Sequence, residues 1–145
     1  MSSQIREAEL KDADKISDCI KESFKKYIPL INKEPEPMIL NYTDVIKEKN
    51  VFILEENSEF IGTIILADGD ETYMWLDILG VYSMYQNRGY GKKLIEFGES
   101  FMLKRGMKES RLYTNVKFEA NIAIYTKLGY AEYDRKTEHG YERVF

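Results

Sequence analysis

The sequence predicts an α/β (α+β) fold with a mixed, mostly antiparallel central sheet of six to seven strands flanked by about four helices. Three apolar runs follow one another at residues 51–54, 60–67 and 72–81, joined by short turns. Segments with helical periodicity precede and follow these runs. Strands and helices do not alternate as in a doubly wound fold, so we expect an antiparallel sheet with helices on both faces.

The N-terminal third contributes mainly helices. Residues 5–8 are expected to form a short strand. Asp12 and Asp14 favour the start of a helix over residues 12–27. Its apolar residues recur at helical spacing: Ile16, Ile20, Phe24 and Tyr27. Three prolines, Pro29, Pro35 and Pro37, are expected to break the following stretch into a loop, before a short helix at residues 41–49.

The central and C-terminal segments complete the sheet. Asp68-Gly69-Asp70 predicts a hairpin before the strand at 72–81, and Gly80 indicates a bulge or a close backbone approach in that strand. A helix is predicted over 89–105, because one face carries Tyr90, Leu94, Phe97 and Phe101. The remaining expected elements are a strand at 109–114, a helix at 119–128 and strands at 130–136 and 140–145.

The composition narrows the classes of function. The chain has 145 residues, which indicates one domain over residues 1–145, and its net charge of −4 disfavours nucleic acid as a partner. No run approaches the roughly 18 apolar residues of a membrane span, and the charged first twenty residues are untypical of a signal peptide. We therefore expect a cytoplasmic protein. The single cysteine, Cys19, excludes an internal disulfide and a cysteine-rich metal site, and no metal is expected.

The most informative stretch for function is Gln86-Asn87-Arg88-Gly89-Tyr90-Gly91, between an apolar run and a predicted helix. A glycine turn at a helix N-terminus exposes several backbone N–H groups, which suit a phosphate group. Gly89 and Gly91 lack a Cβ, so an anion can approach the backbone closely. Arg88 and Lys92 add positive charge. The sequence therefore predicts a ligand that carries phosphates.

This loop, with Val81 before it, resembles the Q/R-x-x-G-x-G/A signature of the GNAT N-acetyltransferases, which binds the pyrophosphate of acetyl-CoA. Residues 121–130, NIAIYTKLGY, resemble the second motif of that family, which ends in Tyr-x-x-Leu-Gly-Phe/Tyr. The resemblance covers nearly the whole chain, and the spacing of the two motifs fits. One departure is Phe118, which stands where the commoner family pattern has an Asn seven residues before the Tyr.

The resemblance implies acetyl-CoA as cofactor and coenzyme A as product. It also implies that the strands at 72–81 and 109–114 splay apart, with the pantetheine arm in the gap. The implied cofactor-binding residues are Leu79, Gly80, Val81, Gln86, Asn87, Arg88, Gly89, Tyr90, Gly91, Lys92, Asn115, Asn121 and Lys127. The departure at Phe118 leaves open which of Asn115 and Asn121 contacts the cofactor, and Lys127 is alternatively an exposed helix lysine.

Two residues are candidates for the chemistry. A phenol such as Tyr125 can protonate the thiolate that acetyl transfer expels; the alternative is a buried aromatic that uses its hydroxyl as a polar handle. The attacking amine needs a base. Asp77 can take the proton directly or through water, and strand alternation predicts that it shares a face with Leu79 and Val81. Glu55 and bulk water are its competitors.

The loop at 27–42 is expected to cover the site of the acceptor amine, with Tyr27, Met38 and Tyr42 as candidate substrate-contacting residues. The alternative is that this segment is a packed surface loop. With only Cys19 and His139 as further nucleophile candidates, neither well placed, direct transfer is favoured over a covalent acyl-enzyme.

The sequence thus predicts an acetyl-CoA-dependent N-acetyltransferase that acts on a primary amine of a small molecule or peptide. A homodimer is a possibility by family analogy. The alternative is a non-catalytic acyl-CoA-binding module or sensor. A nucleotide-phosphate binder is disfavoured, because neither G-x-x-x-x-G-K-[S/T] nor G-x-G-x-x-G is present.

Overall fold

The computed structural model describes residues 3–139 and 141–145. The strands within these residues are β1 (Ser3–Glu7), β2 (Asn50–Glu56), β3 (Glu59–Asp68), β4 (Tyr73–Val81), β5 (Glu109–Arg111), β6 (Thr114–Asn115), β7 (Arg135–Glu138) and β8 (Tyr141–Val144). The α-helices are α1 (Ala13–Phe24), α2 (Ile28–Ile31), α3 (Tyr42–Glu48), α4 (Tyr90–Lys104) and α5 (Glu119–Lys127). The 3₁₀ helices are η1 (Leu10–Asp12), η2 (Lys25–Tyr27), η3 (Glu36–Ile39) and η4 (Ser83–Tyr85).

The predicted mixed, mostly antiparallel architecture is confirmed, but the strands form two sheets. The first has the order β1-β2-β3-β4-β5 and is antiparallel except for the β4–β5 pair. The second has the order β6-β8-β7 and is antiparallel. The expected strand at 109–114 is interrupted at Leu112 and Tyr113, so it contributes β5 to one sheet and β6 to the other. This break explains why the described residues form more strands than the sequence predicted.

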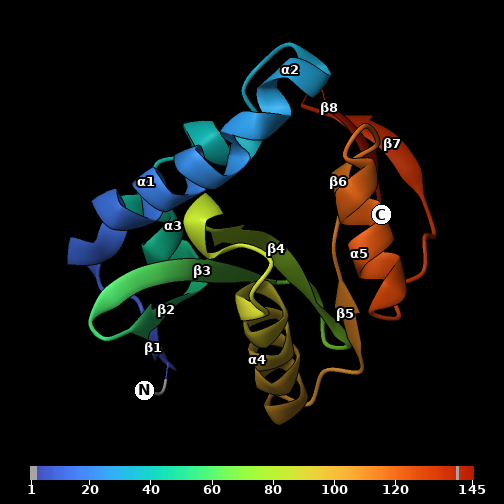
Figure 1. Cartoon of the computed structure of the whole chain (residues 1–145). Coiled ribbons are helices and arrows are strands. Elements are labelled where there is room, and N and C mark those ends of the chain that lie inside the picture. The colour runs from blue at the N-terminus through green and yellow to red at the C-terminus, as the bar shows by residue number, and fades with distance from the viewer. Residues whose placement is uncertain (1–2, 140) are drawn as a thin grey trace.

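Helices cover both faces of the first sheet, as expected. In Figure 1, α1 and α3 lie on one face and α4 on the other, while α5 and the second sheet stand to one side. Two apolar clusters match these layers. One packs the α4 residues Leu94 and Met102 against the sheet, and the other packs the α1 residues Ile16 and Ile20 against the opposite face.

The two strands at the centre of the fold, β4 and β5, pair over only a short length. Tyr73–Trp75 of β4 pairs with Glu109–Arg111 of β5. Beyond Trp75 and Arg111 the two segments diverge, and the segment after β5 continues as β6, which joins the second sheet (Figure 1). Residues 76–81 of β4 therefore pair with β3 on one side and leave the other side open among the described residues.

A β-bulge interrupts the pairing of β4 with β3. Ile65 lies opposite Ile78 while Leu66 lies opposite Leu76, so Asp77 is an extra residue. A bulge reverses the alternation of faces beyond it. Leu76 accordingly packs on the α4 side, whereas Ile78 packs on the α1 and α3 side.

The bulge corrects one sequence-based expectation. Asp77 does not share a face with Leu79 and Val81, since those two side chains pack with the α4 cluster. The Asp77 carboxylate instead meets Lys49, which directly follows α3. The close backbone approach expected at Gly80 is present: a Cβ there would lie 2.7 Å from Ile20 Cδ1 in α1.

The three prolines do not produce the long loop that we expected. Pro29 lies in the first turn of α2 and Pro37 in the first turn of η3, while Pro35 precedes η3. A proline in a first helical turn forfeits no helical hydrogen bond, so these residues start short helices. At the other end of the chain, the expected strand at 130–136 begins only at Arg135, and the predicted strand start at residue 140 lies outside the described residues.

We expect Asp12→Asn to destabilise the fold by about 2 kcal/mol at neutral pH, the typical scale of hydrogen bonds to a charged group. The buried Asp12 carboxylate accepts hydrogen bonds from Arg6 Nη1 and Nη2 at 2.9 and 3.0 Å and from the Glu9 N–H at 2.8 Å. The Arg6 hydrogen bonds lower the pKa of Asp12 below its usual value. A lowered folded-state pKa stabilises the fold above the unfolded pKa of about 4, and this contribution is lost as the pH falls through the folded value.

Thermal unfolding from pH 7 to pH 2 measures this effect. The difference in melting temperature between the wild type and Asp12→Asn should become smaller in the acid range. Asp14→Asn is the matched control, because Asp14 is exposed in the first turn of α1. Equal losses for the two variants, independent of pH, would contradict the assignment.

Candidate active site

A cleft of about 1070 Å³ lies where β4 and β5 diverge. The Leu76–Leu79 segment of β4 lines one side, and α5 lines the other through Asn121 and Tyr125. One end of the cleft reaches the loop before α4, and the opposite end reaches α2, η3 and β8. The cleft thus joins a helix N-terminus to the open side of a β-strand.

The loop before α4 presents a row of free backbone donors. Among the described residues, none accepts a hydrogen bond from the backbone N–H groups of residues 87–92. Asn87 and Gly89 adopt positive φ angles of 64° and 85°, which turn the chain into the helix at Tyr90. Helix N-termini with unpaired N–H groups attract anions. This loop therefore has the geometry of a phosphate site.

The two glycines of this loop border open space. A Cβ built on Gly89 or Gly91 would meet no heavy atom within 4 Å. Gly89 has a conformational reason to be glycine, since its φ is positive. Gly91 is in ordinary helical conformation, where glycine costs roughly 1 kcal/mol relative to alanine. Packing within the chain does not require a glycine at this position, which fits a ligand that approaches the helix closely.

Other side chains support the loop and add charge. Gln86 Nε2 donates to the Val81 carbonyl at 2.9 Å, and Gln86 Oε1 accepts from Lys26 Nζ at 2.9 Å. Lys92 and Lys127 also line the cleft. Lys26 and Lys92 therefore add positive charge beside the loop, and Lys127 adds charge from α5.

The structure places most of the predicted cofactor-binding residues on the cleft and a few away from it. The lining includes Leu79, Val81, Gln86, Asn87, Gly89, Gly91, Lys92, Asn115, Asn121 and Lys127. Three are not part of the lining: Gly80, Arg88 and Tyr90. Gly80 packs against α1, Arg88 is exposed near the Tyr85 ring, and the Tyr90 hydroxyl donates to Glu56.

The two candidate asparagines make different contacts. Asn115 Oδ1 accepts from the Lys117 N–H at 3.0 Å and so closes a turn after β6. Asn121 Oδ1 accepts from the Tyr27 hydroxyl at 3.0 Å, across the cleft. Each leaves its amide NH₂ without a partner among the described residues. Both NH₂ groups thus remain available as donors.

Tyr125 lies on the α5 wall. Its hydroxyl has no hydrogen-bond partner among the described residues, although the ring packs edge-on against Tyr130. Burial, with a smaller effect from Tyr130, raises the pKa of Tyr125 above its ordinary value. The hydroxyl therefore stays protonated at neutral pH, which is the form that donates a proton.

The Asp77 carboxylate is held in the cleft by two partners. Lys49 Nζ lies 2.6 Å from Asp77 Oδ2, and the Tyr113 hydroxyl donates to Oδ1 at 3.3 Å. All three residues line the cleft. The other candidate base, Glu55, does not line the cleft. Its Oε1 lies 2.5 Å from Arg6 Nε.

A second ion-pair cluster closes the end of the cleft near η3. The buried Arg143 pairs with Glu36 at 3.0 Å and with Glu138 at 3.2 Å, and its guanidinium lies 4.3 Å from the centre of the Tyr113 ring. His139 Nδ1 lies 3.0 Å from Glu36. Sequence reasoning missed Lys49, Tyr113, Glu36 and Arg143, because their contacts join segments far apart in the chain.

The predicted acceptor residues separate into two groups. Tyr27 lines the cleft, where its ring stacks on Phe118 with centroids 4.2 Å apart. Met38 and Tyr42 are buried and are absent from the lining. The Tyr42 hydroxyl donates to the Pro37 carbonyl at 2.6 Å, and its ring belongs to the α1 cluster. Both therefore lie behind the residues that line the cleft, and Tyr42 contacts one of them, Pro37.

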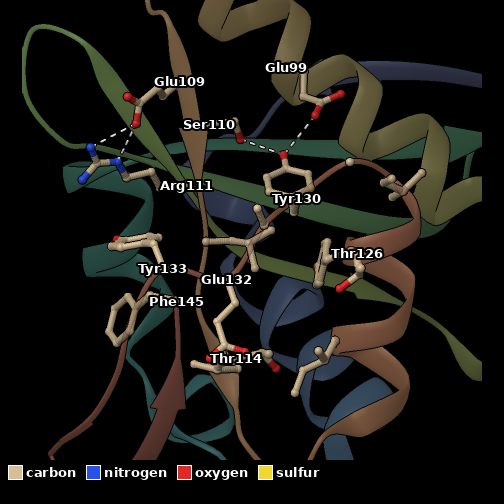
Figure 2. A pocket seen from close by; sticks show the side chains of 17 residues that line it. Glu99, Glu109, Ser110, Arg111, Thr114, Thr126, Tyr130, Glu132, Tyr133 and Phe145 are labelled. Carbon is tan, nitrogen blue, oxygen red and sulfur yellow. Dashed lines mark hydrogen bonds and ion pairs between the residues drawn. The ribbon is translucent and has the colours of Figure 1, made fainter.

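A smaller cavity of about 620 Å³ lies on the other side of α5. Figure 2 shows contacts among some of its polar groups: the Tyr130 hydroxyl bonds to Ser110 and Glu99, and Arg111 pairs with Glu109. Tyr125 and Leu128 line both cavities.

Among the residues that the structure describes, no group of three or more His, Cys, Asp or Glu side chains is placed to hold a metal ion. Within the same residues, no helix has the length and apolar character needed to cross a membrane.

We expect Arg143→Met to destabilise the fold by about 2–3 kcal/mol, below the 3–5 kcal/mol typical of a fully buried pair, because Glu36 and Glu138 keep some solvent contact. The variant removes the Arg143 ion pairs, one of the links between η3 and the second sheet. Urea unfolding measures the loss, with the exposed Arg135→Met as control. A loss of unfolding free energy no larger than that of Arg135→Met would show that the Arg143 ion pairs do not stabilise the fold.

Comparison with known families identifies the family of this chain. The family model described as the acetyltransferase (GNAT) family matches residues 16–130. The chain belongs to the GNAT acetyltransferase family.

Among its curated relatives is N-alpha-acetyltransferase 30 of Schizosaccharomyces pombe, 30% identical over 88 residues, or 58% of this chain and 59% of the relative. Another is a mycothiol acetyltransferase of Renibacterium salmoninarum, 30% identical over 64 residues, or 44% of this chain and 19% of the relative. This chain thus corresponds to only part of the length of these relatives.

Solved structures show the same fold. PaiA N-acetyltransferase from Thermoplasma acidophilum, in complex with coenzyme A, has a TM-score of 0.80 at 22% identity, over 99% of this chain and 98% of that one. The ribosomal-protein-S18-alanine N-acetyltransferase from Escherichia coli has a TM-score of 0.73 at 20% identity, over 99% of this chain and 90% of that one.

Proposed function

We propose that this chain binds acetyl-CoA in the large cleft and transfers the acetyl group to a primary amine. The observation that carries the proposal is the row of free N–H groups at residues 87–92 beside two glycines that border open space. These features suit the pyrophosphate of the cofactor. Family membership and the coenzyme A complex of the PaiA relative support the same ligand.

The open side of β4 suits the pantetheine arm. Residues 76–81 are free of β5, so their backbone groups can hydrogen-bond an extended ligand as another strand would. Asn115 and Asn121 offer free amide NH₂ groups from the other side of the cleft. Acetyl-CoA supplies an activated thioester, and these groups hold it against the strand.

The groups that would carry out acetyl transfer lie between the two ends of the cleft. A backbone N–H near Leu79–Val81 can polarise the thioester carbonyl. Asp77 accepts the proton that the acceptor ammonium must lose, and the protonated Tyr125 hydroxyl donates to the departing sulfur. Most of the rate enhancement would come from holding amine and thioester in line.

The acceptor is a primary amine on a peptide or a small molecule. The cleft end near α2 and η3 combines apolar side chains, Leu30 and Ile31 among them, with the Lys49–Asp77 and Arg143–Glu36 ion pairs. Opposite charges there are matched in number, which favours an acceptor with one amine over a polycation. One of the curated relatives is an N-alpha-acetyltransferase, which supports an α-amine as the acceptor group.

The test is acetylation of an amine panel with mass detection of the product and an assay of free coenzyme A. The panel contains peptides with different first residues, free amino acids, simple amines and polyamines. We expect an acetylated product together with stoichiometric thiol release for at least one amine. Tight acetyl-CoA binding without turnover on the whole panel would favour the alternative, a non-catalytic acyl-CoA-binding module or sensor.

A further inference from the structure

The acceptor end of the cleft contains an amine that belongs to the chain itself. Lys49 follows α3 in extended conformation, so its side chain leaves the helix and enters the cleft. Its Nζ lies 2.6 Å from Asp77 Oδ2, and the side chain remains 30% exposed. A primary amine therefore occupies the place beside Asp77 that an acceptor ammonium would take.

The other lysines of the cleft lie elsewhere. Lys26 donates to Gln86 beside the phosphate loop, and Lys92 lies 3.9 Å from Glu96 on the surface of α4. Lys127 is exposed on α5. Among these four lysines, Lys49 is the one whose Nζ has a carboxylate on β4 within hydrogen-bond distance.

The distances suit transfer to this amine. Asp77 precedes Leu79 by two residues, and the bulge at Asp77 makes this span shorter than the roughly 7 Å of two regular strand residues. The flexible four-carbon stem of lysine can cover the remaining separation by rotation about its side-chain bonds. The bulge at Asp77 turns the carboxylate toward Lys49, so the amine and its proton acceptor meet on one face of the strand.

We propose that the protein acetylates its own Lys49 inside the cleft. This inference rests on the proposed acetyl transfer. Asp77 takes one proton from the Lys49 ammonium, and the neutral Nζ attacks the thioester carbonyl carbon. The N–C bond forms as the C–S bond breaks. The nitrogen passes its second proton to solvent. Tyr125 gives its proton to the departing sulfur and takes one back from solvent, and the Asp77 proton passes to solvent, so that one proton is released overall. The products are N-acetyl-Lys49 and coenzyme A, and the Lys49–Asp77 ion pair is lost.

The experiment incubates the purified chain with acetyl-CoA alone, followed by intact-mass measurement and peptide mapping. We expect one acetyl group per chain at Lys49, at a rate per molecule that does not depend on protein concentration. Lys49→Arg keeps a cation beside Asp77 but removes the acceptor, and it should stay unmodified. Lys47→Arg, which changes an exposed lysine of α3, should be modified like the wild type. Asp77→Asn should slow the reaction at least about 10-fold.

Acetylation of Lys49 no faster than that of Lys47, or a rate that rises with protein concentration, would overturn the inference. An amine panel run in parallel distinguishes failure of self-acetylation from failure of the proposed acetyl transfer. Turnover on an added amine with Lys49 unmodified refutes self-acetylation and leaves the proposed function standing. No modification and no turnover, with acetyl-CoA bound, refutes both.

Discussion

Gly91→Val should reduce the affinity for acetyl-CoA about 100-fold or more, equivalent to about 2.8 kcal/mol of binding free energy. The added side chain projects into space that is open in the free chain, where a Cβ meets no atom within 4 Å. It therefore crowds the proposed phosphate position without crowding the protein. Because valine has a better helix propensity than glycine, the free protein should keep its stability.

Calorimetry measures the affinity, and thermal unfolding without ligand measures the stability. Gly91→Ala adds a smaller side chain at the same position and should reduce the affinity for acetyl-CoA about 10-fold. Ser100→Val is the matched control, since it introduces the same side chain at an exposed position of α4 away from the N-terminus. Unchanged affinity in Gly91→Val would show that the ligand does not approach this helix end.

Tyr125→Phe should lower kcat about 10–100-fold while leaving the affinity for acetyl-CoA nearly unchanged, at the low end of general-acid effects because a thiolate is a fair leaving group. The hydroxyl matters only as negative charge builds on sulfur, which is a transition-state interaction. Its removal breaks no hydrogen bond among the described residues, so the fold should survive.

Steady-state kinetics on the best amine give kcat and KM separately. Tyr133→Phe is the control, because Tyr133 is exposed and does not line the large cleft. A Tyr125→Phe variant with unchanged kcat would assign Tyr125 to packing, and the proton for the sulfur would then come from water or from the attacking ammonium.

Local patterns account for what the sequence predicted well. The apolar spacing of Tyr90, Leu94, Phe97 and Phe101 predicted helix 89–105, and α4 spans Tyr90–Lys104. The turn residues of the Gln86–Gly91 stretch predicted a helix N-terminus with exposed donors, and the structure contains it. These features depend on neighbours within a few positions, which a single sequence records directly.

Features that depend on pairing between distant segments escaped prediction. The bulge at Asp77 follows from the register of β4 against β3, so alternation within β4 alone assigned the wrong face. The Lys49–Asp77 pair joins residues 28 positions apart, and no pattern near either residue indicates the other. Met38 and Tyr42 were expected at the acceptor site, but the short helices in that region turn both side chains toward the core.

Isothermal titration of the purified chain with acetyl-CoA, ATP and NAD, each alone, measures which of the three ligands the cleft binds. We expect one-to-one binding of acetyl-CoA in the micromolar range or tighter, with much weaker binding of the two nucleotides. ATP or NAD carries phosphates but lacks the pantetheine arm that the open side of β4 would hold. Binding of ATP at micromolar concentration with no binding of acetyl-CoA would show that the cleft is not an acetyl-CoA site.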